Sequence, residues 1–246
     1  MLNLQQRRGA RRHNAFACAL VFFVLALAPA TAVFVAPAAF ATEEASRRAQ
    51  EAAPERIPVD LARVQSPGML VTVGGTVTVP SGAFKSGTSD EGFALQDPSG
   101  GLYVRTTTNL HLHVGQRVRV TGRLADSNGQ RILIPAEARD VQVRGRGANI
   151  RAETRPTGRI GEATEGRLVR VAGKITKPVA SDLPYGYRVF IDDGSGEVQA
   201  FVYVSTGIDV RRLRPGGRIE VSGFSGQYND HYELIPRFQS DIRRLR

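Results

Sequence analysis

Few residues of this sequence are spaced for metal binding or catalysis. His111 and His113 place two imidazoles on one side of an extended segment, which is half of a metal site, but no third ligand follows at a metal-binding spacing. The segment Asp192-Asp-Gly-Ser-Gly-Glu197 has the composition of a calcium loop without its ligand spacing, and a hairpin turn accounts for it better. We therefore expect no metal site and no cofactor.

The sequence also contains none of the common catalytic motifs. It has no phosphate-binding P-loop, no G-x-S-x-G elbow and no H-E-x-x-H pair. Cys18 is the one cysteine, and it lies in a leader that we expect to be removed. The sequence thus predicts a binding protein and not an enzyme. Hydrolase activity that is lost on substitution of turn carboxylates such as Asp192 and Asp193 would overturn this prediction.

A different chemistry is available where aromatic and basic residues alternate with apolar ones. Val189 and Ile191 continue a buried register, which leaves Arg188 and Phe190 on the opposite face of the same strand. The facing strand has the same alternation and turns Phe201 and Tyr203 outward. A ring on a solvent-facing strand can stack on a nucleic-acid base, an interaction worth about 1 to 3 kcal/mol per base.

Other residues extend this predicted face. The first half of the chain offers a poorer version of it. The loops of the second half add basic and aromatic side chains that would frame a groove: Lys174, Lys177, Tyr185, Tyr187, Tyr228, His231 and Tyr232. The alternative is that Phe190 and Phe201 pack against the neighbouring module or the preceding helix. The complete set of predicted nucleic-acid-binding residues is Arg188, Phe190, Phe201, Tyr203, Lys174, Tyr187, Tyr232, Tyr103 and Arg105.

The elements that would position these side chains occur twice. The segment 71–80, VTVGGTVTVP, returns as 169–178, VRVAGKITKP, and the blocks 93–97, 115–122 and 133–135 return in the same order as 189–193, 216–223 and 234–236. The offset drifts from 98 to 96 to 101 residues, so insertions and deletions separate the matched blocks. The chain is therefore one module used twice.

Each module is predicted to contain five strands. Period-two alternation marks the strands, and a glycine within the first strand of each module, at Gly74-Gly75 and at Gly173, permits a bend that joins two faces of a barrel. The segments 97–101 and 193–196 predict hairpin turns, and a longer connection separates the third and fourth strands. This order of strands is typical of an OB-fold, a Greek-key barrel.

The spacing of these blocks, F-x-L-x-D-x-x-G followed by G-x-x-V-x-V-x-G, resembles bacterial OB-fold domains of the nucleic-acid-binding type. The resemblance covers both modules. It implies an all-β protein of two tandem five-stranded barrels whose ligands lie on the outer face of strands two and three. OB-folds bind single-stranded nucleic acid, oligosaccharides and proteins, so the resemblance is more specific for the fold than for the ligand.

The ends and connections complete the expected domain plan. Four arginines, an apolar run and small residues predict a signal peptide over 1–41, with Ala32 as an alternative cleavage site and a retained membrane anchor as a further alternative. A tether follows over 42–56. The first OB-fold domain covers 57–144 and the second covers 159–246. The segment 145–158 predicts an exposed linker that would let the modules move relative to each other.

The charge of the mature chain favours an anionic ligand. Removal of the leader leaves 29 basic and 23 acidic residues, a net charge of +6. We expect an exported, periplasmic or secreted protein that binds single-stranded or extracellular nucleic acid, by itself or in assistance to a secreted nuclease, and that keeps no stable membrane span after leader cleavage. The alternative is a module that binds a protein or glycan of the cell envelope. The sequence does not determine the oligomeric state.

Overall fold

The computed structural model describes residues 54–85 and 90–246. These belong to the compact unit Glu51–Arg246. The predicted signal peptide, residues 1–41, and most of the predicted tether lie outside the described residues. Within residues 54–85 and 90–246, no helix has the length and apolar character that a membrane crossing requires.

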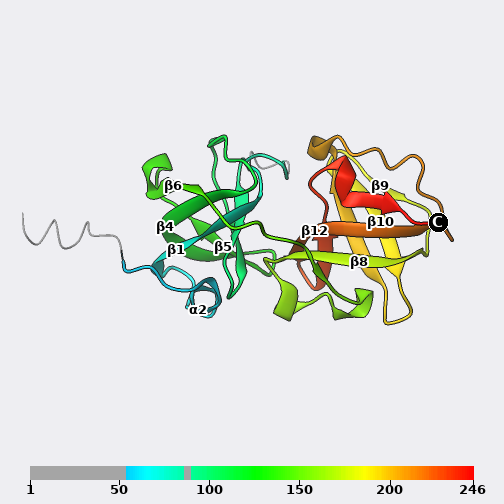
Figure 1. The fold of residues 1–246 in the computed structure, drawn as a ribbon, viewed down its shortest axis with the longest axis horizontal. Coiled ribbons are helices and arrows are strands. Elements are labelled where there is room, and N and C mark those ends of the chain that lie inside the picture. The colour runs from blue at the N-terminus through cyan, green and yellow to red at the C-terminus, as the bar shows by residue number, and fades with distance from the viewer. Residues whose placement is uncertain (1–53, 86–89) are drawn as a thin grey trace, which may run out of the picture. The chain divides into compact units, whose positions relative to one another are not determined.

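The described unit is all-β, with one α-helix of five residues and short 3₁₀ helices (Figure 1). The first half contains α2 (Val59–Arg63), β1 (Leu70–Val79), β2 (Phe93–Gln96), β3 (Gly101–Val104), β4 (Gln116–Ser127), β5 (Gln130–Ile134), η1 (Ala138–Asp140) and β6 (Val141–Arg146). The second half contains β7 (Glu153–Thr154), η2 (Thr157–Arg159), η3 (Glu162–Thr164), β8 (Leu168–Ile175), β9 (Ala180–Asp182), β10 (Gly186–Asp192), β11 (Val198–Tyr203), η4 (Val204–Thr206), β12 (Arg218–Tyr228), β13 (His231–Ile235), η5 (Gln239–Asp241) and β14 (Ile242–Arg244).

The first sheet closes into a five-stranded barrel. Its strands pair in the order β1-β2-β3-β5-β4, and β4 pairs back to β1. The pairing of β3 with β5 is parallel and the others are antiparallel, which is the arrangement of an OB-fold. Strand β6 adds to the outer edge of β4. The predicted all-β fold is therefore confirmed for this half, together with the five-stranded barrel.

The second sheet repeats these pairings. Strand β8 pairs with β10, β10 with β11, β11 with β13 in parallel, and β13 with β12, while β12 also pairs with β8. Strands β14, β7 and β9 extend this sheet. Figure 1 shows the two sheets as successive parts of the chain, the second running from green to red.

Glycines occupy equivalent places where the first strand of each half changes partner. Strand β1 leaves β4 for β2 at Thr76, and β8 leaves β12 for β10 near Lys174. A Cβ atom on Gly75 would lie 2.7 Å from the carbonyl oxygen of Gln96, and one on Gly173 would lie 2.6 Å from that of Asp192. Only glycine admits a backbone approach this close, which accounts for a glycine at the bend in both halves.

Each sheet encloses its own apolar core, and a third buried cluster joins the two. The first core is built around Val73, Phe93 and Leu133, and the second around Val171, Ile191 and Leu234. The third, which we call the junction cluster, contains Val79, Phe84, Ala94, Tyr103 and Ile132 from the first half and Phe224 and Ile235 from the second.

Polar contacts reinforce the junction cluster. The Arg63 guanidinium donates to the buried Glu165 carboxylate at 2.8 Å, and the Arg237 guanidinium donates to the Thr78 carbonyl oxygen at 2.6 Å. The backbone N–H of Leu168 donates to the side-chain oxygen of Gln96 at 2.9 Å. These contacts oppose the independent movement of the two halves that the linker sequence suggested.

Candidate functional site

A pocket of 660 Å³ opens beside the junction cluster, where the two sheets meet. We call it the inter-sheet pocket. The first half contributes the residue after β3, the β4–β5 hairpin and the loop after β1, and the second half contributes β9 to β11 and the β12–β13 hairpin. Its walls include Arg105, Ser127, Arg188, Gln199, Tyr203 and Glu233. The outer face of β10 and β11, which corresponds to strands two and three of an OB-fold, therefore forms one side of it.

Arg105 enters the pocket from the end of β3. Its guanidinium donates to the Ser127 hydroxyl at 2.6 Å, and its Nε atom lies 3.5 Å from the Asp90 carboxylate, within ion-pair distance. The same Nε atom is buried and makes no hydrogen bond to any residue in the described ranges. Burial raises the pKa of Asp90, while the Gly92 backbone N–H and the Arg105 charge oppose this rise. Arg105 is thus held in place by the Ser127 hydroxyl and the Asp90 carboxylate.

Arg188 enters the same pocket from β10, directly across from Phe201 on β11. Its Nε atom is also buried without a hydrogen-bond partner among residues 54–85 and 90–246. A buried donor without a partner costs about 1 to 3 kcal/mol. Two arginines that share one pocket form an arrangement suited to an anionic ligand, because guanidinium groups bind phosphate with paired N–H donors.

A carboxylate and an amide form the wall on β11 and β13. The Gln199 side-chain nitrogen donates to the Glu233 carboxylate at 2.7 Å, and the Nε2 atom of His231 lies 3.8 Å from the same carboxylate. Burial raises the pKa of Glu233, and the hydrogen bond from Gln199 and the charge of His231 oppose this rise. This wall therefore has hydrogen-bonding character.

The predicted aromatic face is largely occupied by protein packing. Tyr203 stacks on Phe84 with ring centroids 5.5 Å apart and meets the edge of Phe201 at 4.8 Å. Phe201 is only 8% exposed and packs against the backbone of Gly186. Burial also raises the pKa of the Tyr203 hydroxyl. Both rings line the pocket, but their faces are engaged by neighbouring side chains.

Two other tyrosines are more open. Tyr185, in the turn before β10, and Tyr228, at the end of β12, both line the pocket and are about half exposed. Tyr228 meets the exposed ring of His231 with centroids 5.9 Å apart. Of the side chains that the sequence placed around a groove, Tyr185, Tyr228 and His231 line the pocket, while Lys174, Lys177, Tyr187 and Tyr232 do not.

Tyr103 is buried in the junction cluster. Its ring lies 5.9 Å from that of Phe224 and is buried, so its face is not available for a base. Burial and the neighbouring Asp90 raise the pKa of the Tyr103 hydroxyl. Tyr103 and Arg105 were the first-half members of the predicted face, and both reach the pocket, one as a packed ring and the other as a charge.

Four of the predicted binding residues lie outside the pocket lining. Phe190 shares the outer face with Gln199, and the Lys177 ammonium lies 4.4 Å from its ring centroid. Lys174 is exposed beside Arg218 at the other end of β12. Tyr187 packs on the second core, and the Tyr232 hydroxyl donates to Glu162 at 3.0 Å. The pKa of Tyr232 is raised to about 12 by burial and by this carboxylate.

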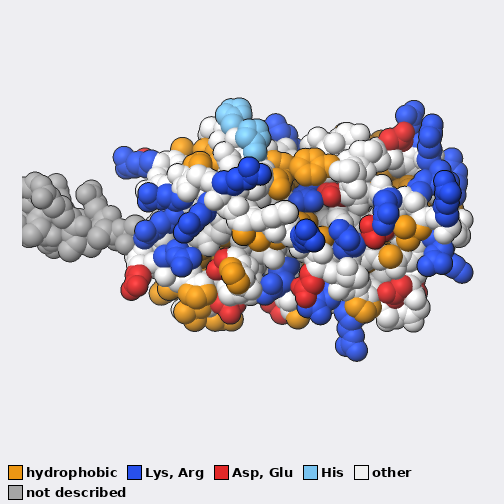
Figure 2. Space-filling view, in the orientation of Figure 1, with side chains coloured by type: hydrophobic (Ala, Val, Ile, Leu, Met, Phe, Trp, Pro, Cys, Tyr) orange, Lys and Arg blue, Asp and Glu red, His pale blue; other side chains and the backbone are white. Residues whose placement is uncertain are grey.

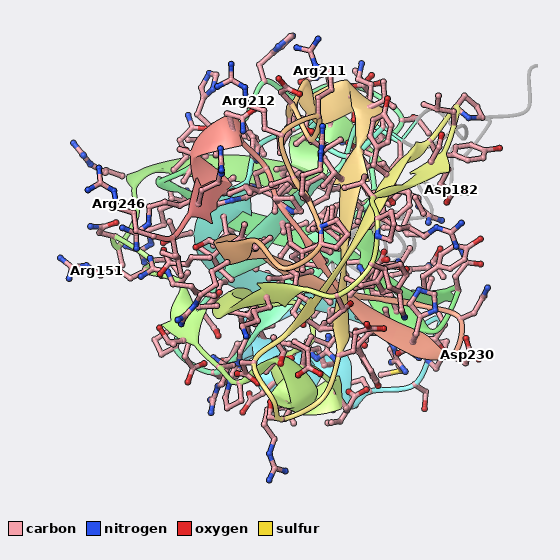
Figure 3. All side chains as sticks on the ribbon, turned by 90° about the vertical axis from the view of Figure 1, so that its right-hand side faces the viewer. Arg151, Asp182, Arg211, Arg212, Asp230 and Arg246 are labelled. Atoms are coloured by element: carbon pink, nitrogen blue, oxygen red, sulfur yellow. The ribbon has the colours of Figure 1, made fainter. Side chains whose placement is uncertain are left out.

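Basic side chains lie on several parts of the surface. Figure 2 shows Lys and Arg side chains at both ends of this face of the unit, over the first and the second sheet. In Figure 3, which views the right-hand end, the labelled Arg151 and Arg246 project on the side opposite to Asp182 and Asp230. Asp182 lines the pocket, and Arg151 and Arg246 do not.

The sequence reasoning missed residues that shape the pocket from the junction cluster, above all Phe84 and Phe224. A signal was available for Phe224. Gly122 of the first half corresponds to Gly223 of the second, so Phe224 stands where the first half has Arg123. A buried aromatic in one repeat at the position of an exposed arginine in the other marks a contact that only one repeat makes.

The described residues hold no group of three or more His, Cys, Asp or Glu side chains placed to bind a metal ion. His111 and His113 are both exposed in the loop before β4, and His111 adopts a positive φ of 53°. Their segment is therefore a turn at this point and not the extended strand on which the sequence placed them.

Comparison with known proteins gives one match among curated sequences. No protein-family model matches the chain. Endonuclease YhcR of Bacillus subtilis (strain 168) is 26% identical over 185 residues. The match covers 71% of this chain and 15% of that relative, so the chain corresponds to a small part of the endonuclease's length.

Some solved structures are also similar. A murine DNA-binding protein bound with double-stranded DNA matches with a TM-score of 0.37 and 12% identity, over 67% of this chain and 90% of that one. The OB domain of MM0293 from Methanosarcina mazei matches with a TM-score of 0.33 and 16% identity, over 39% of this chain and 86% of that one. At these TM-scores the matches carry no argument, and the fold rests on its strand pairing.

The endonuclease match corrects one prediction. The absence of catalytic motifs predicted that the chain is not an enzyme, and a relative named as an endonuclease contradicts this. The physical reason is that motif searches recognise only sites whose residues are close in sequence. Catalytic groups that come from separate segments leave no such local pattern.

Proposed function

We propose that this chain is a tandem of two OB-fold barrels that binds single-stranded nucleic acid in the inter-sheet pocket and acts in endonucleolytic cleavage. The repeated strand pairing of β8 to β13 supports the second barrel. The similarity to an endonuclease supports nucleic acid as the ligand and cleavage as the reaction. The leader-like residues 1–41 support export, to the periplasm or the medium.

The observation that carries this proposal is the presence of two arginines, Arg105 and Arg188, in the lining of one pocket. Asp90 lies within ion-pair distance of Arg105, whereas no ion pair of Arg188 is found within the described residues. A phosphate group accepts from guanidinium N–H groups and balances the charge of Arg188. Tyr185 and Tyr228 stand half exposed at the same pocket and supply ring faces for the flanking bases.

Single-stranded nucleic acid fits this arrangement better than a duplex. A pocket of 660 Å³ is large enough for a nucleotide but is enclosed by two sheets. The bases of a single strand can enter this pocket directly. The bases of a duplex would first have to unpair and unstack, which costs free energy.

The binding part of the proposal is tested by fluorescence anisotropy of the mature chain with a labelled single-stranded DNA, with heparin as a polyanion that lacks bases. Arg188→Ala should weaken DNA binding about tenfold or more and lower the slope of log affinity against log salt by about 1. Arg139→Ala is the matched control, because Arg139 is exposed and pairs only with Glu137 at the surface. Equal loss in both variants, or equal binding of heparin and DNA, would refute the pocket as the site.

The cleavage part needs its own assay. A circular single-stranded DNA has no ends, so its linearisation in the presence of Mg²⁺ or Ca²⁺ reports endonucleolytic cleavage alone. We expect linearisation by the full chain, weakened in Arg188→Ala. DNA binding without any linearisation would refute the proposed role in cleavage and leave the binding site intact.

Export is tested separately by expressing the full chain with its leader and sequencing the N-terminus of the mature protein. We expect Thr42 as the first residue. An intact N-terminus in the cytoplasmic fraction would refute export.

A further inference from the structure

The wall of the inter-sheet pocket on β11 and β13 carries hydrogen-bond acceptors that the protein leaves unused. Gln199 and Glu233 are direct neighbours in the parallel pairing of these strands. One N–H of Gln199 donates to one carboxylate oxygen of Glu233 at 2.7 Å. Within the described residues, two side-chain oxygens of this wall accept no hydrogen bond. They are the side-chain amide oxygen of Gln199 and the second carboxylate oxygen of Glu233. Both residues line the pocket, so these oxygens are within reach of a ligand.

The position of Glu233 is costly for the protein alone. The residue is only 5% exposed, and a buried carboxylate without full pairing loses much of its solvation. The Nε2 atom of the His231 ring lies 3.8 Å from the carboxylate, and the negative charge of Asp182 on β9 raises the pKa of Glu233 further. A ligand that brings N–H donors to this wall would recover the lost interactions.

The bases of nucleic acid differ in this respect. Cytosine and adenine carry an exocyclic amino group that donates hydrogen bonds, and carboxylates accept from the amino group of cytosine. Thymine has no amino group. In single strands these edges are free of pairing and open to side chains.

We propose that Gln199 and Glu233 read the amino group of a base in the inter-sheet pocket, so that the chain prefers cytosine and adenine over thymine. The proposal rests on the proposed function, since it needs a nucleic acid in the pocket. It assigns the arginines to the backbone phosphates and this wall to base identity. Sites that hydrogen-bond a ligand group discriminate strongly against analogues without it, because their own polar groups are then left unpaired.

The test compares oligo-dC, oligo-dA and oligo-dT of equal length at pH 7.5 and one salt concentration. We expect dC and dA to bind at least tenfold more tightly than dT. Glu233→Gln should bring the ratio close to 1, because the substitution replaces one acceptor of the wall by an N–H donor, which cannot accept from an amino group and can donate to a thymine carbonyl oxygen. Glu197→Gln is the matched control, since Glu197 pairs with Thr176 and Lys177 away from the pocket.

The outcomes separate the two proposals. Equal affinity of the wild-type chain for all three oligonucleotides would refute base reading and leave nucleic-acid binding in place. Absence of binding to any of them would refute the proposed function itself. If Glu233→Gln does not fold, as judged by circular dichroism, Gln199→Ala decides, because Gln199 is half-buried and its loss removes the second acceptor. A preference that survives both substitutions would also refute base reading.

Discussion

Phe224 is the residue whose removal tests most directly whether the two halves form one structure. It lies on β12 of the second half and is 1% exposed. Its ring centroid is 6.2 Å from that of Phe84 and 5.9 Å from that of Tyr103, both in the first half. Truncation to alanine leaves a cavity between elements that cannot easily collapse, because both sides are built on closed or paired sheets. Phe→Ala substitutions in such positions cost about 3 to 5 kcal/mol.

This cost predicts a measurable change in melting temperature. For a protein of this size, 1 kcal/mol corresponds to about 2 to 4 °C, so Phe224→Ala should lower the melting temperature by about 6 to 20 °C. Circular dichroism of the mature chain during thermal unfolding measures it. We expect the wild type to unfold in a single transition and the variant to separate into two, since the junction cluster couples the halves.

Phe238→Ala is the control for this experiment. Phe238 is also an aromatic of the second half, but it is 39% exposed and should cost less than about 1 kcal/mol when truncated. If Phe224→Ala lowers the melting temperature no more than Phe238→Ala does, the junction cluster does not stabilise the protein and the coupling of the halves is refuted.

Three further predictions follow from close contacts, charge and exposure. Gly101→Ala should lower the melting temperature, because its Cβ would lie 1.8 Å from the Gly166 carbonyl oxygen. Gly161→Ala should not, because the nearest atom to its Cβ would be a ring carbon of Tyr232 at 4.0 Å, and equal melting temperatures of the two variants would contradict this prediction. Hydrogen bonds from Ser and Thr side chains depress the pKa of Asp193 well below its usual range, so its stabilising effect is full above its unfolded pKa of about 3.9 and is lost as pH falls through the folded pKa. Asp193→Asn should therefore destabilise at pH 7 and progressively less as the pH is lowered to about 2, and a difference in melting temperature that does not shrink over this range would exclude this cause. Tyr228→Ala should weaken single-stranded DNA binding by about 5- to 100-fold, while Tyr232→Phe, which loses only a bond outside the pocket, should leave the anisotropy titration unchanged.

The repeat predicted much of the fold because it marks residues under the same geometric constraint in both halves. Gly75 and Gly173 were expected to bend a strand between two partners, and both contact a neighbouring carbonyl at the place where the partner changes. The same holds for the burial of Val189 and Ile191, because alternation is a property of each strand alone. Properties that a strand has by itself, such as its alternation of buried and exposed residues, can be predicted from the sequence without knowledge of tertiary contacts.

The sequence predicted the site less well, because the site depends on contacts between the two halves. Tyr103 and Tyr203 lie on the predicted outer face, but partners from the other half cover them, and no local pattern states where one sheet meets the other. Tyr187 is a different case. Extending the register of Val189 and Ile191 by one more step would have placed it inward, where it packs on the second core.

The two β-hairpin tips that border the inter-sheet pocket are joined to each other. The backbone N–H of Asn229, between β12 and β13, donates to the carbonyl oxygen of Asn128, between β4 and β5, at 2.6 Å, and the Gln227 backbone N–H donates to the Gln130 side chain at 3.2 Å. Surface loops usually gain and lose residues freely during evolution. These two turns have lost that freedom, since lengthening either one would break its bond to the other. An insertion in one of these turns would therefore require a compensating change in the other, a constraint that spans the two halves.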